Sequence, residues 1–201
     1  MTGLRKSSDE RRAELISAAR AVALAEGLEH VTGRKVAAKA GLSSGLVFFH
    51  FDGRQALLEA VLDALLEDIF GGLEVPEGDG PADERMLQFL EHRVSRLRHE
   101  RRQLELFIDF WVLGTREASV RRRIREGLER YREQVRPLAT RVASSRPGMT
   151  GDALAQVAVS FILGCALQVV MDSGRIDTAE YFEAVRSLFV ASRPAAREKK
   201  S

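Results

Sequence analysis

Hydrophobic residues recur every three or four positions along nearly the whole chain, and no segment alternates between apolar and polar residues as a half-buried strand does. The sequence therefore predicts an all-α protein. The capping box Ser7-x-x-Glu10 marks the start of the first helix, and Gly27 marks its end. Further helices are expected at residues 33–40, 43–50, 53–69, 82–99, 101–115, 120–142, 151–172 and 178–192, with Asp52-x-x-Gln55 and Asp177-x-x-Glu180 as caps.

Two of these helices are short and are joined at Gly41, a pattern typical of a helix-turn-helix. If Gly33 is position one, then Ala37 is position five, Gly41 is position nine and Val47 is position fifteen. A small residue at Ala37 lets the two helices cross closely, and Gly41 permits a left-handed turn. Val47 is expected to pack back onto the first of the two helices.

The segment RRAELISAARAVALAEGLEHVTGRKVAAKAGLSSGLVFFHFDGRQALLEAVL resembles the DNA-binding domain of the TetR family of bacterial transcriptional regulators. Two later segments resemble the C-terminal domain of the TetR subgroup that includes the choline-responsive betaine-synthesis repressor. They are LFIDFWVLGTREASVRRRIREGLERYREQVRPL and FILGCALQVVMDSGRID. The resemblance implies a three-helix DNA-binding domain at residues 1–53, a helical effector-binding and dimerisation domain at 54–192, and a flexible tail at 193–201. It implies a cytoplasmic homodimer that binds double-stranded DNA at a palindromic operator and is released by a small-molecule effector.

Helical angles divide the second short helix into two faces. Val47 and Phe51 point to the core, whereas Leu46 and Phe49 fall on the face that a helix-turn-helix lays in the major groove. The family usually has Tyr at Phe48 and polar residues at Leu46 and Phe49, so we expect few hydrogen bonds to bases; whether Phe49 contacts bases or only packs is left open. The expected DNA-binding residues are Thr32, Arg34, Lys35, Lys39, Ser43, Ser44, Gly45, Leu46, Phe48, Phe49 and Arg54.

Composition narrows the remaining chemistry. The 201 residues carry a net charge of +2, and the first 54 hold nine Lys and Arg against six Asp and Glu, so affinity for a polyanion has to come from local clustering. The single Cys165 suits a reducing cytoplasm, and no signal peptide is visible. No catalytic motif, cofactor motif or metal-binding spacing is present, so an enzyme is not expected. The arginines from Arg121 to Arg125 are interpreted as a surface paired with interleaved glutamates.

Aromatic residues in the C-terminal half are candidates for an effector cavity. Trp111 and its neighbours can hold a quaternary ammonium group by cation–π attraction, or enclose an uncharged apolar molecule; ordinary core packing is the competing interpretation. The expected effector residues are Phe89, His92, Phe107, Phe110, Trp111 and Gln168.

The last two helices are apolar over too much of their circumference to face solvent. Residues 153–171 have the composition of a membrane span, but a buried helix at a dimer interface fits better because no second span accompanies it. The expected dimer residues are Val157, Phe161, Cys165, Phe182, Val185 and Phe189. An inert buried thiol is expected at Cys165, with a redox switch as the alternative.

Three functions stay open at this level: a ligand-released repressor or an activator of the same design, a DNA-architectural protein without an effector, and a helical ligand-binding protein whose helix-turn-helix is vestigial. The sequence gives neither the operator and its target genes nor the effector.

Overall fold

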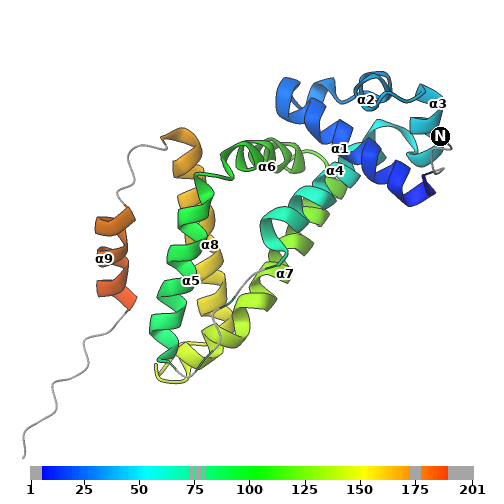
Figure 1. Cartoon of the computed structure of the whole chain (residues 1–201). Helices are drawn as coiled ribbons and strands as arrows, with labels where there is room; N and C mark the ends of the chain where they lie inside the picture. Colours follow the sequence, from blue (N-terminus) through cyan, green and yellow to red (C-terminus); the bar gives the residue numbers. More distant parts are fainter. Residues whose placement is uncertain (1–5, 73–74, 76–77, 79, 173–177, 190–201) are drawn as a thin grey trace, which may run out of the picture. The chain divides into compact units, whose positions relative to one another are not determined.

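A computed structural model describes residues 6–72, 75, 78, 80–172 and 178–189, apart from the side chains of 178, 179, 188 and 189. All the regular structure in these residues is helical, so the all-α prediction is confirmed (Figure 1). The helices are α1 (Ser8–Glu26), the 3₁₀ turn η1 (Leu28–His30), α2 (Gly33–Ala40), α3 (Ser44–His50), α4 (Gly53–Phe70), α5 (Ala82–Leu97), α6 (Arg101–Gly114), α7 (Ala118–Ala143), α8 (Gly151–Met171) and α9 (Thr178–Phe189).

The chain forms two compact units. The first comprises residues 1–72 and 102–129, and the second comprises residues 73–101 and 130–201, so α7 contributes to both. The expected boundary after residue 53 divides the chain by role, whereas the compact units keep α4 together with α1, α2 and α3. The division by role stays a prediction.

The first unit contains the expected helix-turn-helix. The Oγ1 atom of Thr32 accepts a hydrogen bond from the backbone N–H of Lys35 at 3.3 Å, which caps α2. Gly41 ends α2 with a φ of 66°, the left-handed conformation for which glycine was predicted. Ala37 and Val47 are buried, which confirms the predicted packing of α2 against α3.

The start of α4 differs from the prediction. Asp52 makes no side-chain capping bond, so the expected Asp52-x-x-Gln55 cap is wrong. The ψ of Asp52 is 72°, far from the extended ψ near 150° of the residues that do cap α2 and α3. Instead, Arg54 fixes this helix start by donating from Nε to the carbonyl of Val31 at 3.0 Å and from a terminal nitrogen to the carbonyl of Leu28 at 2.7 Å.

The N-terminal half of α7 is fastened to α4 within the first unit. Arg123 donates to Glu59 at 2.9 Å and to Asp63 at 2.5 Å, and Gln55 donates to Ser119 at 3.1 Å. A Cβ atom at Gly127 would stand 3.2 Å from the Leu66 methyl groups, so the glycine permits this close approach. The partners of Arg123 thus come from α4, whereas the sequence indicated the glutamates of its own helix.

The second unit is built from α5, α8, α9 and the C-terminal half of α7. α5 packs against α8 and α9. The C-terminal half of α7 buries the side chains of Tyr131, Val135, Leu138 and Val142 in this unit. α8 has the length and hydropathy of a membrane span, and half of its most apolar stretch is buried within the chain.

Candidate nucleic-acid interface and ligand pocket

α3 exposes two large aromatic side chains. Phe48 is 65% exposed and Phe49 is 77% exposed, while Val47 and Phe51 are buried as the helical angles predicted. The ring of Phe49 meets only the edge of its neighbour His50 among the described rings, with centroids 5.1 Å apart. The core of the first unit therefore leaves Phe49 free to contact another molecule.

Two glycines shape the surface around these rings. A Cβ atom at Gly33 would lie 3.3 Å from the Cζ atom of Phe48, so the start of α2 leaves space for that ring. At Gly45, in contrast, a Cβ atom would meet only the Oγ atom of Ser43, at 3.9 Å. Packing within the chain does not require a glycine at position 45, which is consistent with close backbone approach to an external partner.

Polar groups surround the aromatic face. Arg34, Lys35, Lys39 and Ser44 are exposed. Lys35 pairs with Glu26, and this hydrogen bond lowers the pKa of the Glu26 carboxyl. No charge partner is found for Arg34 in the described part of the chain, so its guanidinium is available to a phosphate or a base.

The remaining predicted DNA-binding residues have roles within the fold as well. The Oγ atom of Ser43 accepts from the backbone N–H of Leu46 at 3.3 Å and so caps α3, as Thr32 caps α2. Each hydroxyl keeps its own hydrogen for donation. Arg54 already donates to two carbonyls, so its predicted phosphate contact depends on its remaining donors.

The six predicted effector residues are divided between the two units. Phe107, Phe110 and Trp111 lie in the first unit, and Phe89, His92 and Gln168 lie in the second. Phe89, Phe107 and Phe110 are buried as core residues, whereas His92 and Gln168 are exposed. Trp111 is 44% exposed and rests edge-on against Phe107, with ring centroids 5.8 Å apart. A shared effector site for all six stays a prediction.

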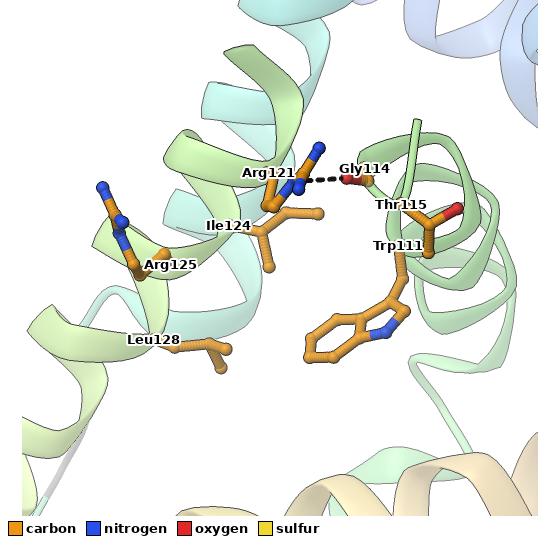
Figure 2. A pocket seen from close by; sticks show the side chains of 7 residues that line it. All are labelled: Trp111, Gly114, Thr115, Arg121, Ile124, Arg125 and Leu128. Atoms are coloured by element: carbon orange, nitrogen blue, oxygen red, sulfur yellow. Dashed lines mark hydrogen bonds between the residues drawn. The ribbon is translucent and has the colours of Figure 1, made fainter. Parts of the chain in front are cut away.

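Trp111 lines a pocket of about 280 Å³ (Figure 2). Its indole extends from α6 toward α7, where the apolar side chains of Ile124 and Leu128 lie beside Arg121 and Arg125. Arg121 donates from Nε to the carbonyl of Gly114 at 3.0 Å. The other lining residues are Gly114 and Thr115.

Sequence reasoning missed the two arginines of this pocket because it treated the arginine run as one surface. A signal was present: Arg121, Arg125 and Leu128 follow each other at four- and three-residue spacing, which places them on one helical face. Arg123 is on another face and binds α4.

A second hollow, about 460 Å³ in volume, lies in the first unit between α6 and the segment that follows α1. Glu29, Arg54 and Arg116 line it together with Asp109. Burial raises the pKa of the Asp109 carboxyl, and the negative charges of Glu29 and Glu105 raise it further.

The second unit presents an apolar face on α8. Val157, Leu167 and Met171 are 50%, 53% and 78% exposed, and Phe161 is half-buried. Of the other predicted dimer residues, Cys165, Phe182 and Val185 are buried within the chain, and the side chain of Phe189 lies outside the described residues. Asp177, the other expected cap, also lies outside them.

Cys165 is buried, and whether its thiol is inert stays a prediction. Its Sγ atom lies 3.4 Å from the hydroxyl of Tyr181, and burial raises the pKa of the thiol. Burial also raises the pKa of Tyr181 to about 12. Among the described residues, no three His, Cys, Asp or Glu side chains come together in a group suited to a metal ion.

Comparison with known proteins agrees with this architecture. Residues 15–61 match the profile "Bacterial regulatory proteins, tetR family". The repressor KstR2 of Rhodococcus jostii (strain RHA1) is 36% identical over 61 residues, which are 30% of this chain and 30% of that protein. The chain thus spans less than two thirds of the curated relatives that it matches.

Solved structures extend the similarity to the whole fold. A TetR transcription regulator from Haloarcula marismortui ATCC 43049 has a TM-score of 0.72 at 18% identity, covering 90% of this chain and 94% of that one. FadR from Bacillus subtilis, in complex with stearoyl-CoA, has a TM-score of 0.69 at 18% identity, covering 90% and 98%. At this identity the likeness shows the fold alone.

Of the two family profiles, the C-terminal one matches the longer segment. Residues 82–192, more than half of the chain, match the profile "BetI-type transcriptional repressor, C-terminal". The chain therefore belongs to the TetR family of bacterial transcriptional regulators, with a BetI-type C-terminal domain.

Proposed function

We propose that this chain is a repressor that binds a palindromic operator as a homodimer in the cytoplasm and is released by a small-molecule effector. The observation that carries the proposal is the exposed face of α3 with Phe49 outward, in a helix-turn-helix whose helices are capped at Thr32 and Ser43 and joined through the left-handed Gly41. Arg34 of α2 has no charge partner in the described part of the chain. Such a face fits the major groove, where Leu46 and Phe49 offer apolar contact to thymine methyl groups.

The polar residues around α3 would position the chain on the phosphates. The charges and hydroxyl groups that would contact the DNA phosphates come from Thr32, Lys35, Lys39, Ser43 and Ser44. Gly45 would allow the backbone of α3 to approach the DNA closely. Arg34 would contact a base or the minor groove, and the remaining donors of Arg54 would bind a further phosphate. Phe48 lacks the hydroxyl that would bind a phosphate and lies at the edge of the contact.

A homodimer would cover the apolar face of α8. Val157, Phe161, Leu167 and Met171 meet the same face of a second copy, while Cys165, Phe182 and Val185 are buried within the chain. The two helix-turn-helix regions of such a dimer would then bind DNA half-sites about 34–36 Å apart, or a multiple of that distance.

Release requires a path from ligand to DNA-binding head, and contacts within the first unit offer one. Arg123 links α7 to Glu59 and Asp63 of α4. Arg54, at the start of α4, holds the carbonyls of Leu28 and Val31. A ligand that moved α7 would therefore also move α4 and the helix-turn-helix. To release the DNA, the ligand would need to bind the DNA-free conformation more favourably than the DNA-bound one by about 1–3 kcal/mol. The stearoyl-CoA complex of FadR supports ligand binding by this fold.

The proposal is tested by selecting bound duplexes from a random DNA pool and measuring how the affinity of the selected sequence depends on salt. We expect a palindrome with two half-sites and an affinity that falls steeply with salt. Absence of duplex binding would contradict the proposal and favour a helical ligand-binding protein with a vestigial helix-turn-helix.

The apolar character of Leu46, Phe48 and Phe49 favours one second candidate, a DNA-architectural protein. Without polar side chains for base edges, α3 would add affinity with little sequence preference. The same selection distinguishes the two functions, because an architectural protein binds duplexes without enriching a consensus.

A further inference from the structure

We propose that the outer face of α3 recognises the C5 methyl group of a pyrimidine base, which thymine and 5-methylcytosine both supply. This inference names the chemical group that the proposed regulator reads in its operator, and it rests on that function for the statement that the partner is duplex DNA. It goes beyond apolar contact in general, because it makes the methyl group the feature on which sequence preference depends.

The outer face of α3 has no hydrogen-bonding side chain. Gly45, Leu46 and Phe49 share this face by helical angle, and none of them carries a side-chain donor or acceptor. Phe49 is exposed and Leu46 is partly exposed. The polar side chains of α3, Ser44 and His50, lie off this face by their helical angles. Base edges under the centre of the helix therefore meet hydrocarbon only.

His50 orders the ring of Phe49. The two rings meet edge-on, with centroids 5.1 Å apart and an interplanar angle of 88°. Such edge-to-face pairs are favourable, so the exposed ring loses part of its freedom before it meets a partner. A side chain that is ordered in advance costs less entropy on binding, which increases the contribution of a methyl group beneath it.

The major groove offers one apolar group to such a face. Guanine N7 and O6, adenine N7 and thymine O4 are acceptors, the amino groups of adenine and cytosine are donors, and C5 of thymine carries a methyl group. An apolar side chain over a donor or an acceptor displaces water without replacing its hydrogen bond, which costs free energy. Over the methyl group, the side chain gains contact and no hydrogen bond is lost. 5-Methylcytosine carries the same group at the same ring atom.

The charges beside this face fit duplex DNA rather than an apolar protein surface. Arg34, Lys35 and Lys39 of α2 are exposed, and phosphates border the major groove. Contacts from these cations would position α3 without reading sequence. The contribution of a methyl group can therefore be measured as a difference between two duplexes that share the same phosphates.

The experiment uses the full chain and a duplex of the sequence most enriched in selection from a random pool. Each thymine of its half-sites is replaced in turn by deoxyuridine, which lacks only the methyl group. Replacement at a methyl group that the face covers should weaken binding about fourfold, measured by fluorescence anisotropy at constant salt. The same replacement in the flanking sequence is the control and should have no effect. Equal affinities of the thymine and uracil duplexes at every half-site position overturn the inference.

A second pair of duplexes distinguishes the two sources of the methyl group. At a position where deoxyuridine weakens binding, the base pair is replaced by guanine paired with cytosine or with 5-methylcytosine. Binding about fourfold tighter to the methylated duplex supports both bases as sources. Equal binding to these two duplexes overturns 5-methylcytosine as a source and leaves thymine alone.

Phe49→Ala tests which side chain covers the methyl group, and Phe48→Ala is the matched control because Phe48 is an exposed phenylalanine at the edge of the same helix. In Phe49→Ala the affinity ratio between thymine and uracil duplexes should fall close to unity, whereas Phe48→Ala should keep the wild-type ratio. An unchanged ratio in Phe49→Ala, or an equal fall in both variants, overturns the assignment to Phe49. Absence of duplex binding contradicts the proposed function and this inference with it, whereas duplex binding with equal affinities overturns this inference alone.

Discussion

α3 and α8 both expose large apolar side chains, but their surroundings differ. Beside Phe48 and Phe49 lie cations and helix-capping hydroxyls. Beside Val157 and Leu167 lie uncharged residues such as Ser160 and Gly164 on the same helix. An apolar patch within a cationic surface fits a polyanion, and one within a neutral surface fits a second copy of the chain. The charge of the residues around an exposed apolar side chain therefore indicates its binding partner better than the hydrophobicity of the side chain itself does.

The largest effect is expected at the neutral face. Leu167→Glu would place a carboxylate twice in the symmetric interface, where it cannot be solvated, and should weaken dimerisation by about 2–4 kcal/mol. Sedimentation equilibrium measures the change, and Gln88→Glu on the exposed side of α5 is the control. If Leu167→Glu dimerises as the wild type does, α8 covers something other than a second copy.

Arg54→Ala tests the cationic surface and its link to the fold. Loss of the bonds to the Leu28 and Val31 carbonyls should lower the free energy of unfolding by about 1–3 kcal/mol, as followed by chemical denaturation. A phosphate role predicts in addition weaker binding to all DNA sequences and a salt slope flatter by about one. An unchanged slope leaves Arg54 with its structural role only. Arg34→Ala removes no hydrogen bond or ion pair within the described part of the chain, so it should leave stability unchanged.

Phe49→Ala sharpens the contrast between the two apolar patches. Discrimination between operator and random DNA should fall by about 1 kcal/mol because contact with the bases is lost, while stability is retained since the ring is exposed. Competition binding measures the ratio. Met171→Ala removes a side chain of similar exposure from α8 and should leave the ratio unchanged. Intact discrimination in Phe49→Ala would assign the ring to packing.

The smallest effect is expected at Asp109. Because its folded pKa is raised, the native state holds the proton more tightly than the unfolded chain, so stability falls as pH rises through the interval between the unfolded and folded values. Asp109→Asn should remove this dependence and stabilise the protein at neutral pH by a few tenths of a kcal/mol, since the group is largely solvated. Denaturation at acidic and neutral pH measures it; an equal change at both values would contradict the assignment.

Sequence patterns between neighbouring residues predicted much of the helix-turn-helix region. The cap at Ser7 and the turn at Gly41 depend on neighbouring residues only, and both were confirmed. The cap at Asp52 was predicted wrongly because the backbone of Asp52 does not have the extended ψ of the residues that cap α2 and α3, a conformation that residue spacing alone does not encode. The sequence also did not predict that Arg121 and Arg125 line the pocket of Trp111. This depends on how α6 and α7 lie together in the fold, which residue spacing does not encode.

The hydrogen-bonded and protonated thiol of Cys165 has a kinetic consequence. A thiol reagent reacts with the thiolate, so modification has to wait until α8 and α9 separate and expose the group. Because this is the single cysteine of the chain, the rate of its labelling measures how often that part of the second unit opens. Slower labelling at higher protein concentration would show that a second copy keeps the helices closed, without any engineered reporter.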